Sequence, residues 1–372
     1  MTAFKRKVFY LSGFDPRGAR FYHELLAEQV SLADHLRLGA RRREGPDASW
    51  HLTRSDDATD CAVHFLAWDD LVRRHWPRGA ASLLAKLAAA YARFLTRGRW
   101  SQTSAVPRGS KLALAFPGLM LAGIALPMAL LVGLVSGAGF LALGWPWWLA
   151  VIPALIVAAL VAVPVAERGH GLWLARFVIF NDALARARAG ADLDARLDAF
   201  AARLAEAMGE DCDELLFVTH SNGSILAVPV MARLLDRVGT MPAHFALVTL
   251  GSSIPLVGFR RDASAFHAAL DRVAMGDFAW LDIGSLTDGA AIPLVDPCLT
   301  RPARPRRLIQ KSPRWHLYCD PSKYRARRSD KYLVHFDYLR RLDRASALDF
   351  LSLLTAPQPL ARSIAAFEAE ND

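Results

Sequence analysis

The residues best placed for chemistry lie in the segment ELLFVTHSNGSILAVPVMARLL, which runs from Glu214 to Leu235. An apolar run with the features of a buried parallel strand ends at Thr219, and an apolar helix begins near Ser224. The turn between them contains Ser221, whose hydroxyl would lie at the start of the helix. Backbone amides and the helix dipole favour negative charge there, so a reacting oxygen would be stabilised. The alternative is an ordinary turn in which Ser221 caps the helix.

The turn Thr219-His220-Ser221-Asn222-Gly223 resembles the nucleophile elbow of the α/β-hydrolase superfamily, usually written G-x-S-x-G. The turn in that motif is so sharp that small residues are needed two positions either side of the nucleophile. Gly223 matches the second glycine, whereas Thr219 stands in place of the first. The resemblance covers roughly residues 7–70 and 172–355. It implies that Ser221 is the nucleophile of a lipase-like or esterase-like serine hydrolase.

The resemblance also implies an acid and then a base downstream of the serine, in that chain order. Asp288 follows a strand predicted over residues 278–283, where the acid of the family usually lies. Asp282 falls within that strand and Asp296 lies far into the following loop, so both are weaker candidates. Asp288 also precedes Gly289, and an Asp-Gly pair is equally typical of a plain turn.

The base implied by the resemblance is His335, which lies just before a last helix predicted over residues 338–355. His316 is the rival base. A half-buried histidine with satisfied ring nitrogens is the structural alternative for His335. His220 is adjacent to Ser221 and is expected to point away from it, so it is not assigned as the base.

Two backbone amides usually bind the developing oxyanion in this family, and one comes from the residue after the nucleophile, here Asn222. The second comes from the loop after an early strand, predicted here over residues 7–12. We assign it to Phe14, with Gly13 giving the backbone freedom. The same loop also suits a plain turn before Pro16. The resemblance implies neither a metal nor an organic cofactor.

A second feature excludes a simple soluble protein, because the 55 residues from Leu112 to Ala166 include no Asp, Glu, Lys, Arg or His. A spanning helix needs roughly 20 apolar residues, so this block suits two transmembrane helices. We place them near Leu114–Val135 and Trp147–Val165, with a turn in SGAGFLALGWP between them. The alternative is a buried hairpin in a large soluble core, which would normally show amphipathic periodicity.

The positive charges around this block predict its orientation. Arg93, Arg108 and Lys111 precede the first span, Arg168 and Arg176 follow the second, and the turn carries no positive charge. The positive-inside rule then places both flanks and both termini in the cytoplasm, as in a bacterial-type inner membrane. The hydrolase fold needs the early strand and the serine strand in one sheet. An even number of spans is therefore required, which agrees with two.

The charge and the cysteine content of the chain indicate which partners and which kinds of cysteine chemistry to expect. The chain has 372 residues and a formal net charge of +9, which favours an anionic partner such as a membrane surface. No nucleic-acid motif accompanies the charge, so nucleic acid is not expected as a partner. The basic segment between Arg301 and Arg328 suits either anionic headgroups or a solvated loop. The four cysteines have no CxxC or zinc-like spacing, so reduced thiols are expected.

Together these features predict an α/β-hydrolase-like, mostly parallel sheet flanked by helices, with an inserted two-helix transmembrane hairpin. The domain is formed by residues 1–111 and 167–372, and the hairpin by residues 112–166. The expected function is a membrane-anchored serine hydrolase that cleaves an ester, with lipids suggested by location alone. An acyltransferase with the same triad and a non-catalytic membrane scaffold are the alternatives. The expected partners are the lipid bilayer and an ester or lipid substrate, and the oligomeric state is left open.

Overall fold

Runs of consecutive apolar residues form the centre of a β-sheet in the computed structural model, which describes residues 3–56 and 58–371. Within these ranges the sheet has nine strands in the order β2-β4-β5-β1-β6-β7-β8-β9, with β3 paired to β4. The strands are β1 (Phe4–Leu11), β2 (Leu36–Leu38), β3 (Arg42–Glu44), β4 (Asp47–Arg54), β5 (Thr59–Leu66), β6 (Glu214–His220), β7 (Phe245–Leu250), β8 (Ala279–Ile283) and β9 (Leu308–Lys311). The prediction of an α/β fold with a mostly parallel sheet is confirmed.

The middle of the sheet is parallel. β1 pairs in parallel with both β5 and β6, and the parallel pairing continues through β7, β8 and β9. Every residue of β6 and β7 is buried, which explains why most side chains on both faces of these strands are apolar. Because parallel strands end at the same edge, the loops after β1, β6, β7 and β8 lie together there. We call this edge the carboxyl edge of the sheet.

Three strands at the other side of the sheet, the short β2 and β3 and the eight-residue β4, were missed by the sequence prediction. β2 and β3 both pair antiparallel with β4, which is itself antiparallel to β5. Trp50 and Leu52 of β4 are buried, but the segment around them is rich in arginine. A tight turn between β3 and β4 uses Gly45 at φ +62°, a conformation that glycine adopts readily.

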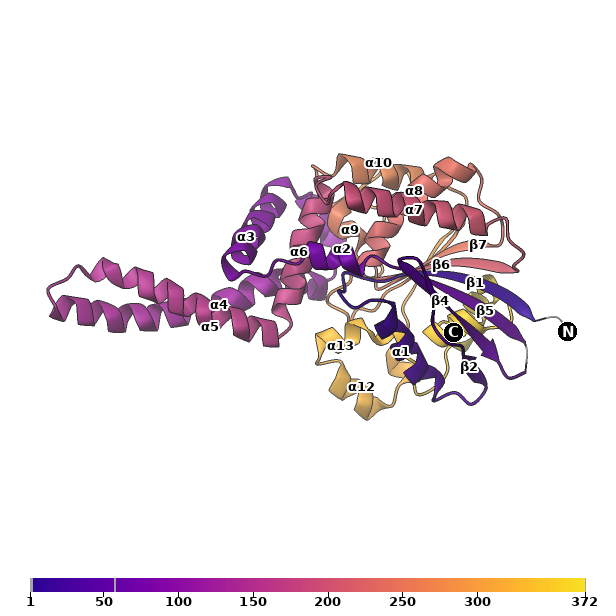
Figure 1. Cartoon of the computed structure of the whole chain (residues 1–372), viewed down its shortest axis with the longest axis horizontal. Coiled ribbons are helices and arrows are strands. Elements are labelled where there is room, and N and C mark those ends of the chain that lie inside the picture. The colour runs from indigo at the N-terminus through magenta and orange to yellow at the C-terminus, as the bar shows by residue number, and fades with distance from the viewer. Residues whose placement is uncertain (1–2, 57, 372) are drawn as a thin grey trace. The chain divides into compact units, whose positions relative to one another are not determined.

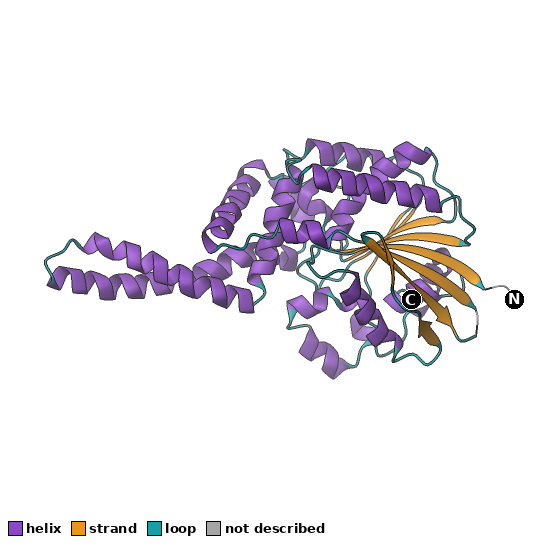
Figure 2. Ribbon diagram, in the orientation of Figure 1, coloured by secondary structure: helices purple, strands orange, loops and turns teal. Residues whose placement is uncertain are grey.

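Helices cover both faces of the sheet (Figure 1). One face carries α7 (Ala191–Ala207), α8 (Asn222–Val238) and α10 (Ser264–Ala274). The other face carries α1 (Ala19–Val30), α12 (Pro321–Arg327) and α13 (Lys331–His335). The remaining helices of this part of the chain are α2 (Asp69–Arg74), η1 (Trp100–Ala105), α9 (Ile254–Gly258), α11 (Trp315–Tyr318), η3 (Asp337–Leu339), α14 (Phe350–Thr355) and α15 (Leu360–Asn371). Figure 2 shows the strands fanned out between these two layers.

Two predicted helices differ from the structure. The continuous helical pattern of residues 69–96 predicts a single helix, but the structure divides this segment into α2 and α3 (Ala80–Arg97), with Pro77 in the break. The helix expected over residues 338–355 is restricted to α14, and it is not the last helix, because α15 follows it. Asp349 caps α14 by accepting a hydrogen bond from the amide of Ser352, which explains why the helix begins only there.

The chain divides into two compact units. The sheet unit comprises Met1–His75, Arg97–Ser110 and Ala183–Asp372, and the helical unit comprises Trp76–Thr96 and Lys111–Asp182. The helical unit contains α3, α4 (Arg108–Ala142), η2 (Trp147–Ala150), α5 (Val151–Arg168) and α6 (Gly171–Ala185), apart from a few terminal residues. It has a hydrophobic core of its own, which includes Leu83, Leu121 and Leu172.

The predicted hairpin is formed by α4 and α5, which run side by side (Figure 1). Small residues let the two helices approach closely. A Cβ atom added at Gly133 would lie 3.7 Å from Ala154, and one added at Gly137 would lie 3.7 Å from Ala150. By length and composition, Arg108–Ala142 and Trp147–Arg168 are each long and apolar enough to cross a membrane.

The hairpin turn is shorter than predicted. The turn was expected within residues 136–146, but α4 continues to Ala142 and only Leu143–Pro146 separate it from η2. Glycine and serine are well tolerated in an apolar helix, so Ser136 and Gly137 do not end it. At 35 residues, α4 is about 52 Å long at 1.5 Å per residue, which exceeds a hydrocarbon core of roughly 30 Å.

The basic segment between Arg301 and Arg328 forms many ion pairs within the chain. The pairs are Arg301–Asp271, Arg304–Asp296, Arg307–Asp277, Lys311–Glu368, Lys323–Asp343 and Arg327–Asp337. These acidic partners offset much of the positive charge that the segment would otherwise present to anionic headgroups.

Candidate functional site

Ser221 occupies a strained turn at the carboxyl edge of the sheet. It lies between β6 and α8 with φ +57° and ψ −124°, a backbone conformation that residues other than glycine seldom adopt. Its amide donates a hydrogen bond to the carbonyl of Leu250 at the end of β7, at 2.8 Å. Only 3% of Ser221 is exposed. The neighbouring strands therefore hold the serine in a conformation that it would not adopt alone.

Two glycines permit close contact between this turn and the end of β1. A Cβ atom at Gly223 would lie 2.4 Å from the carbonyl oxygen of Leu11 and 2.8 Å from that of Ser12. A Cβ atom at Gly13 would lie 2.9 Å from the Cβ of Ser221. Thr219 fits in place of the expected first glycine; it is fully buried, and its hydroxyl lies 3.4 Å from the carbonyl oxygen of Val248 on β7.

Replacement of Gly223 by alanine is expected to lower the free energy of unfolding by about 2–3 kcal/mol, because the new methyl group would collide with backbone oxygens that cannot rotate away. Chemical denaturation of the purified variant would measure this. Gly209→Ala is the matched control, since its added Cβ would be 3.7 Å from its nearest neighbour, an ordinary contact. Equal stability of the two variants would contradict the prediction.

His335 connects Ser221 to a carboxylate. It is the last residue of α13, it is 1% exposed, and its Nε2 lies 2.7 Å from the Oγ of Ser221. Its Nδ1 lies 2.9 Å from Oδ2 of Asp288. A carboxylate only accepts hydrogen bonds, so Nδ1 carries the proton and Nε2 accepts from the serine hydroxyl. An imidazole in this arrangement can take the hydroxyl proton and make the oxygen a stronger nucleophile.

Asp288 is held in the loop after β8 by further polar contacts. Its Oδ1 accepts a hydrogen bond from the amide of Ala290 at 2.9 Å, and its side chain is completely buried. The phenol of Tyr338 accepts a hydrogen bond from the amide of Ser285 at 2.9 Å, three residues before the aspartate. Burial raises the pKa of Tyr338 well above its usual value, and the nearby charge of Asp288 raises it further.

The two alternative carboxylates, Asp282 and Asp296, form contacts with other residues. Asp282 accepts hydrogen bonds from Thr249 at 2.7 Å and from Gln310 at 3.0 Å, and burial raises its pKa to about 6. Asp296 pairs with Arg304 at 2.8 Å. The structure thus brings Asp288, and neither competitor, to His335.

The rival base lies outside this arrangement. His316 is an exposed residue of α11, whereas His335 is buried beside Ser221.

The two predicted oxyanion residues are adjacent to Ser221. Asn222 is the first residue of α8, where a backbone amide has no partner within the helix. Phe14 follows Gly13, and its buried ring packs against Trp68 at 6.1 Å. Gly13 was expected to supply backbone freedom, but it is not among the described glycines with positive φ. Its importance is its closeness to Ser221, and the donor role of both amides stays a prediction.

Sequence reasoning missed a contact between His220 and His335. His220 was expected to point away from Ser221 and it does not bond the serine hydroxyl, but its ring contacts the neighbouring His335. Its Nε2 lies 2.8 Å from the main-chain oxygen of His335, and the two ring centroids are 4.9 Å apart. No sequence signal indicates this contact, because the two histidines are 115 residues apart.

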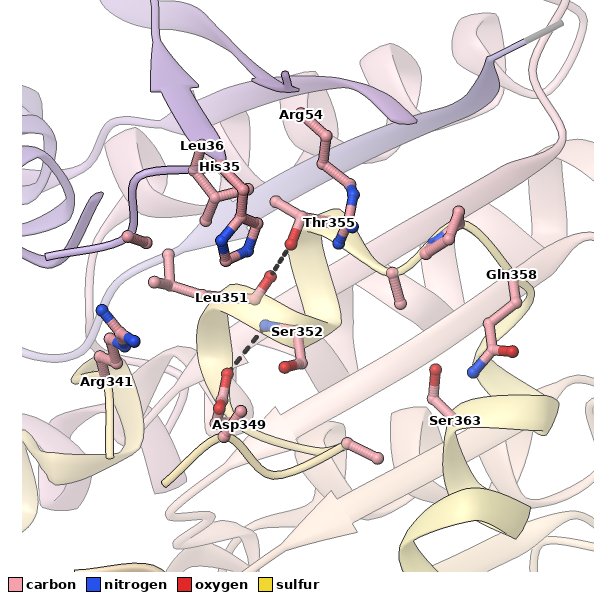
Figure 3. Close-up of a pocket in the computed structure, with 15 residues that line it drawn as sticks. His35, Leu36, Arg54, Arg341, Asp349, Leu351, Ser352, Thr355, Gln358 and Ser363 are labelled. Carbon is pink, nitrogen blue, oxygen red and sulfur yellow. Dashed lines mark hydrogen bonds between the residues drawn. The ribbon is translucent and has the colours of Figure 1, made fainter. Parts of the chain in front are cut away.

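A separate cavity of about 260 Å³ lies between the β2–β4 side of the sheet and α14 (Figure 3). Two of its charged side chains form contacts within the chain. Arg54 pairs with Asp56 at 2.9 Å, and Asp349 accepts from the amide of Ser352 at 2.8 Å. Its lining includes none of the predicted site residues. Within residues 3–56 and 58–371, no group of three or more His, Cys, Asp or Glu side chains is arranged to hold a metal ion.

Comparisons with models of protein families, with curated proteins and with solved structures found no match to this chain. The fold and the side-chain geometry are therefore the basis for any functional assignment.

Proposed function

We propose that the protein is a serine hydrolase of the α/β-hydrolase type that cleaves an acyl ester, with Ser221, His335 and Asp288 as its catalytic triad. The observation that carries the proposal is the imidazole of His335, which lies 2.7 Å from the Ser221 hydroxyl and 2.9 Å from the Asp288 carboxylate. The strained backbone of Ser221 supports it, because such strain is often found where a nucleophile must be presented.

The proposed reaction follows from these contacts. His335 takes the hydroxyl proton as the Oγ of Ser221 attacks the acyl carbonyl, and Asp288 stabilises the imidazolium that forms. The amides of Phe14 and Asn222 bind the oxyanion, each contributing roughly 2–4 kcal/mol if well aligned. The imidazolium then protonates the departing alkoxide, which leaves an acyl group on Ser221. Water activated by the same imidazole releases the acid and restores the hydroxyl.

The hairpin is proposed to anchor this enzyme in the membrane by two spans. β1 precedes the hairpin in sequence and β6 follows it, yet they pair directly, with Val8 opposite Leu216. Only an even number of spans leaves both strands on one side of a bilayer. By the positive-inside rule, the basic flanks favour a cytoplasmic location for the sheet unit and both termini, as in a bacterial-type inner membrane.

A lipid ester is the proposed substrate. The first three residues of α4 belong to the sheet unit, and a Cβ atom at Gly109 would lie 3.9 Å from the main-chain oxygen of Leu286. Leu286 is 63% exposed and lies two residues before Asp288, while Leu333, 36% exposed, lies two residues before His335. The helix that leads into the apolar hairpin therefore starts beside the loop of the acid, with exposed leucines nearby.

Fluorophosphonate labelling tests the proposed function. The purified protein in detergent is expected to gain one adduct, which peptide mass analysis should locate on Ser221. No adduct, or an adduct elsewhere, would contradict the hydrolase assignment. Product analysis with a diacyl lipid and an added alcohol separates the reaction types, because an acyltransferase would form more transfer product than free acid.

A further inference from the structure

His220 precedes the nucleophile, and its ring is buried against the segment that carries His335. It is 1% exposed, and its Nε2 lies 2.8 Å from the main-chain oxygen of His335. The two imidazole rings are 4.9 Å apart and inclined at 38°. The rings of Phe336 and Tyr338 lie 5.6 and 5.9 Å from the His220 ring. The residue before Ser221 thus contacts the base and the two aromatic side chains that follow it.

This contact gives the carbonyl of His335, at the end of a short helix, a hydrogen-bond partner. α13 ends at His335, and the last carbonyls of a helix have no partner within it. A carbonyl oxygen only accepts hydrogen bonds, so the Nε2 of His220 must carry the proton. The Nδ1 of the neutral ring is then unprotonated. Nδ1 is buried and has no hydrogen-bond partner in the described part of the chain. Burial lowers the pKa of His220 well below its usual value, and the neighbouring His335 lowers it further.

We infer that His220 is a positioning residue for the base, and this inference rests on the proposed function. Its Nε2–H fixes the main chain at His335, so that the imidazole of His335 keeps its bonds to Ser221 and Asp288 at the same time. His220 and Ser221 are consecutive residues at the end of β6. The end of this one strand therefore fixes the positions of both the nucleophile and its base. A shift of about 1 Å between such groups can cost about a hundredfold in rate.

The test is His220→Leu in the full chain, which removes the donor and keeps an apolar side chain. We expect the maximal rate constant of fluorophosphonate acylation to fall about ten- to hundredfold, because the base loses its alignment. The concentration for half-maximal rate should stay unchanged, since probe binding does not use His220. His220→Gln is expected to recover most of the rate, because its amide nitrogen reaches about as far as Nε2.

His267→Leu is the matched control. His267 is also buried, at 6% exposure, and its Nε2 lies 2.9 Å from the carbonyl oxygen of Gly258. His267→Leu therefore loses the same kind of bond, but this bond joins α10 to α9 and involves none of the proposed site residues, so its acylation rate should equal that of the unmodified chain. An equal loss of rate in the two leucine variants would overturn the inference, because the effect would then be general.

A second pair keeps the test decisive if His220→Leu folds poorly. The asparagine side chain of His220→Asn is shorter by one methylene than the glutamine of His220→Gln, and it cannot reach the carbonyl of His335. Slow acylation with Asn and fast acylation with Gln supports the positioning role, whereas equal rates overturn it. Absence of any adduct on the unmodified chain would be a failure of the proposed function itself, which separates the two conclusions.

Discussion

Replacement of Ser221 by alanine is expected to abolish fluorophosphonate labelling and to lower ester turnover by about 10⁴- to 10⁶-fold. The alanine variant keeps the turn, the helix start and both oxyanion amides, and it loses only the attacking oxygen. Alanine meets the same strain at φ +57° as serine does, so the free energy of unfolding should change by no more than about 1 kcal/mol. Thermal unfolding measured alongside activity separates loss of chemistry from loss of fold.

The three proposed catalytic side chains should behave as one unit. Once Ser221 is absent, the base has no proton to take, so adding His335→Gln to Ser221→Ala is expected to cost little further activity. His335→Gln alone should lose nearly as much as Ser221→Ala. If the losses of the two single variants instead multiplied in the double variant, the residues would be acting independently and the proposed mechanism would be wrong.

Ser363→Ala is the matched control for these variants. Ser363 is also a buried serine, 2% exposed, but it lies on α15 in the cavity of Figure 3. Its alanine variant should label and turn over like the unmodified chain. Persistent labelling of Ser221→Ala, with the adduct mapped to another residue, would exclude Ser221 as the nucleophile.

The parts of the site predicted from sequence are those with a local signal. The strand, turn and helix around Ser221 could be predicted because an apolar run, a Ser-x-Gly turn and an apolar helix follow each other in the chain. The other two residues of the arrangement, His335 beside Ser221 and Asp288 beside His335, were reached only through a family resemblance. Nothing in their own segments indicates that residues 221 and 335 meet, since tertiary packing alone brings them together.

The missed features depend on partners that the sequence does not reveal. β2, β3 and β4 lie at one side of the sheet, where β2 and β4 are only partly buried and β3 has no buried residue, so their mixed pattern of charged and apolar residues resembles a loop. The role of His220 depends on the end of α13, which is a helix of five residues with little signal of its own. The short hairpin turn was missed because Gly and Ser, which usually indicate a turn, remain helical in α4.

Shortening the hairpin is expected to release the protein from membranes and to leave labelling of Ser221 intact. The contacts of Gly133 with Ala154 and of Gly137 with Ala150 show an antiparallel register, which places residue 126 opposite residue 161. Deletion of residues 126–161, with a short Gly/Ser turn in their place, removes the tip and much of the exposed apolar surface. It keeps Leu121 and Ala162, which belong to the core of the helical unit.

The shortened chain is expected to leave the membrane because the removed residues carry much of the exposed apolar surface. Leu126, Leu130 and Leu134 are 64–68% exposed, and each leucine in a spanning helix favours the membrane by about 0.5 kcal/mol. Sedimentation of cell membranes should leave the shortened chain in the supernatant, whereas full-length Ser221→Ala should remain in the pellet. A shortened chain that still pellets but is released by high salt would identify a basic surface as the anchor, because salt screens charge attraction and leaves apolar insertion intact.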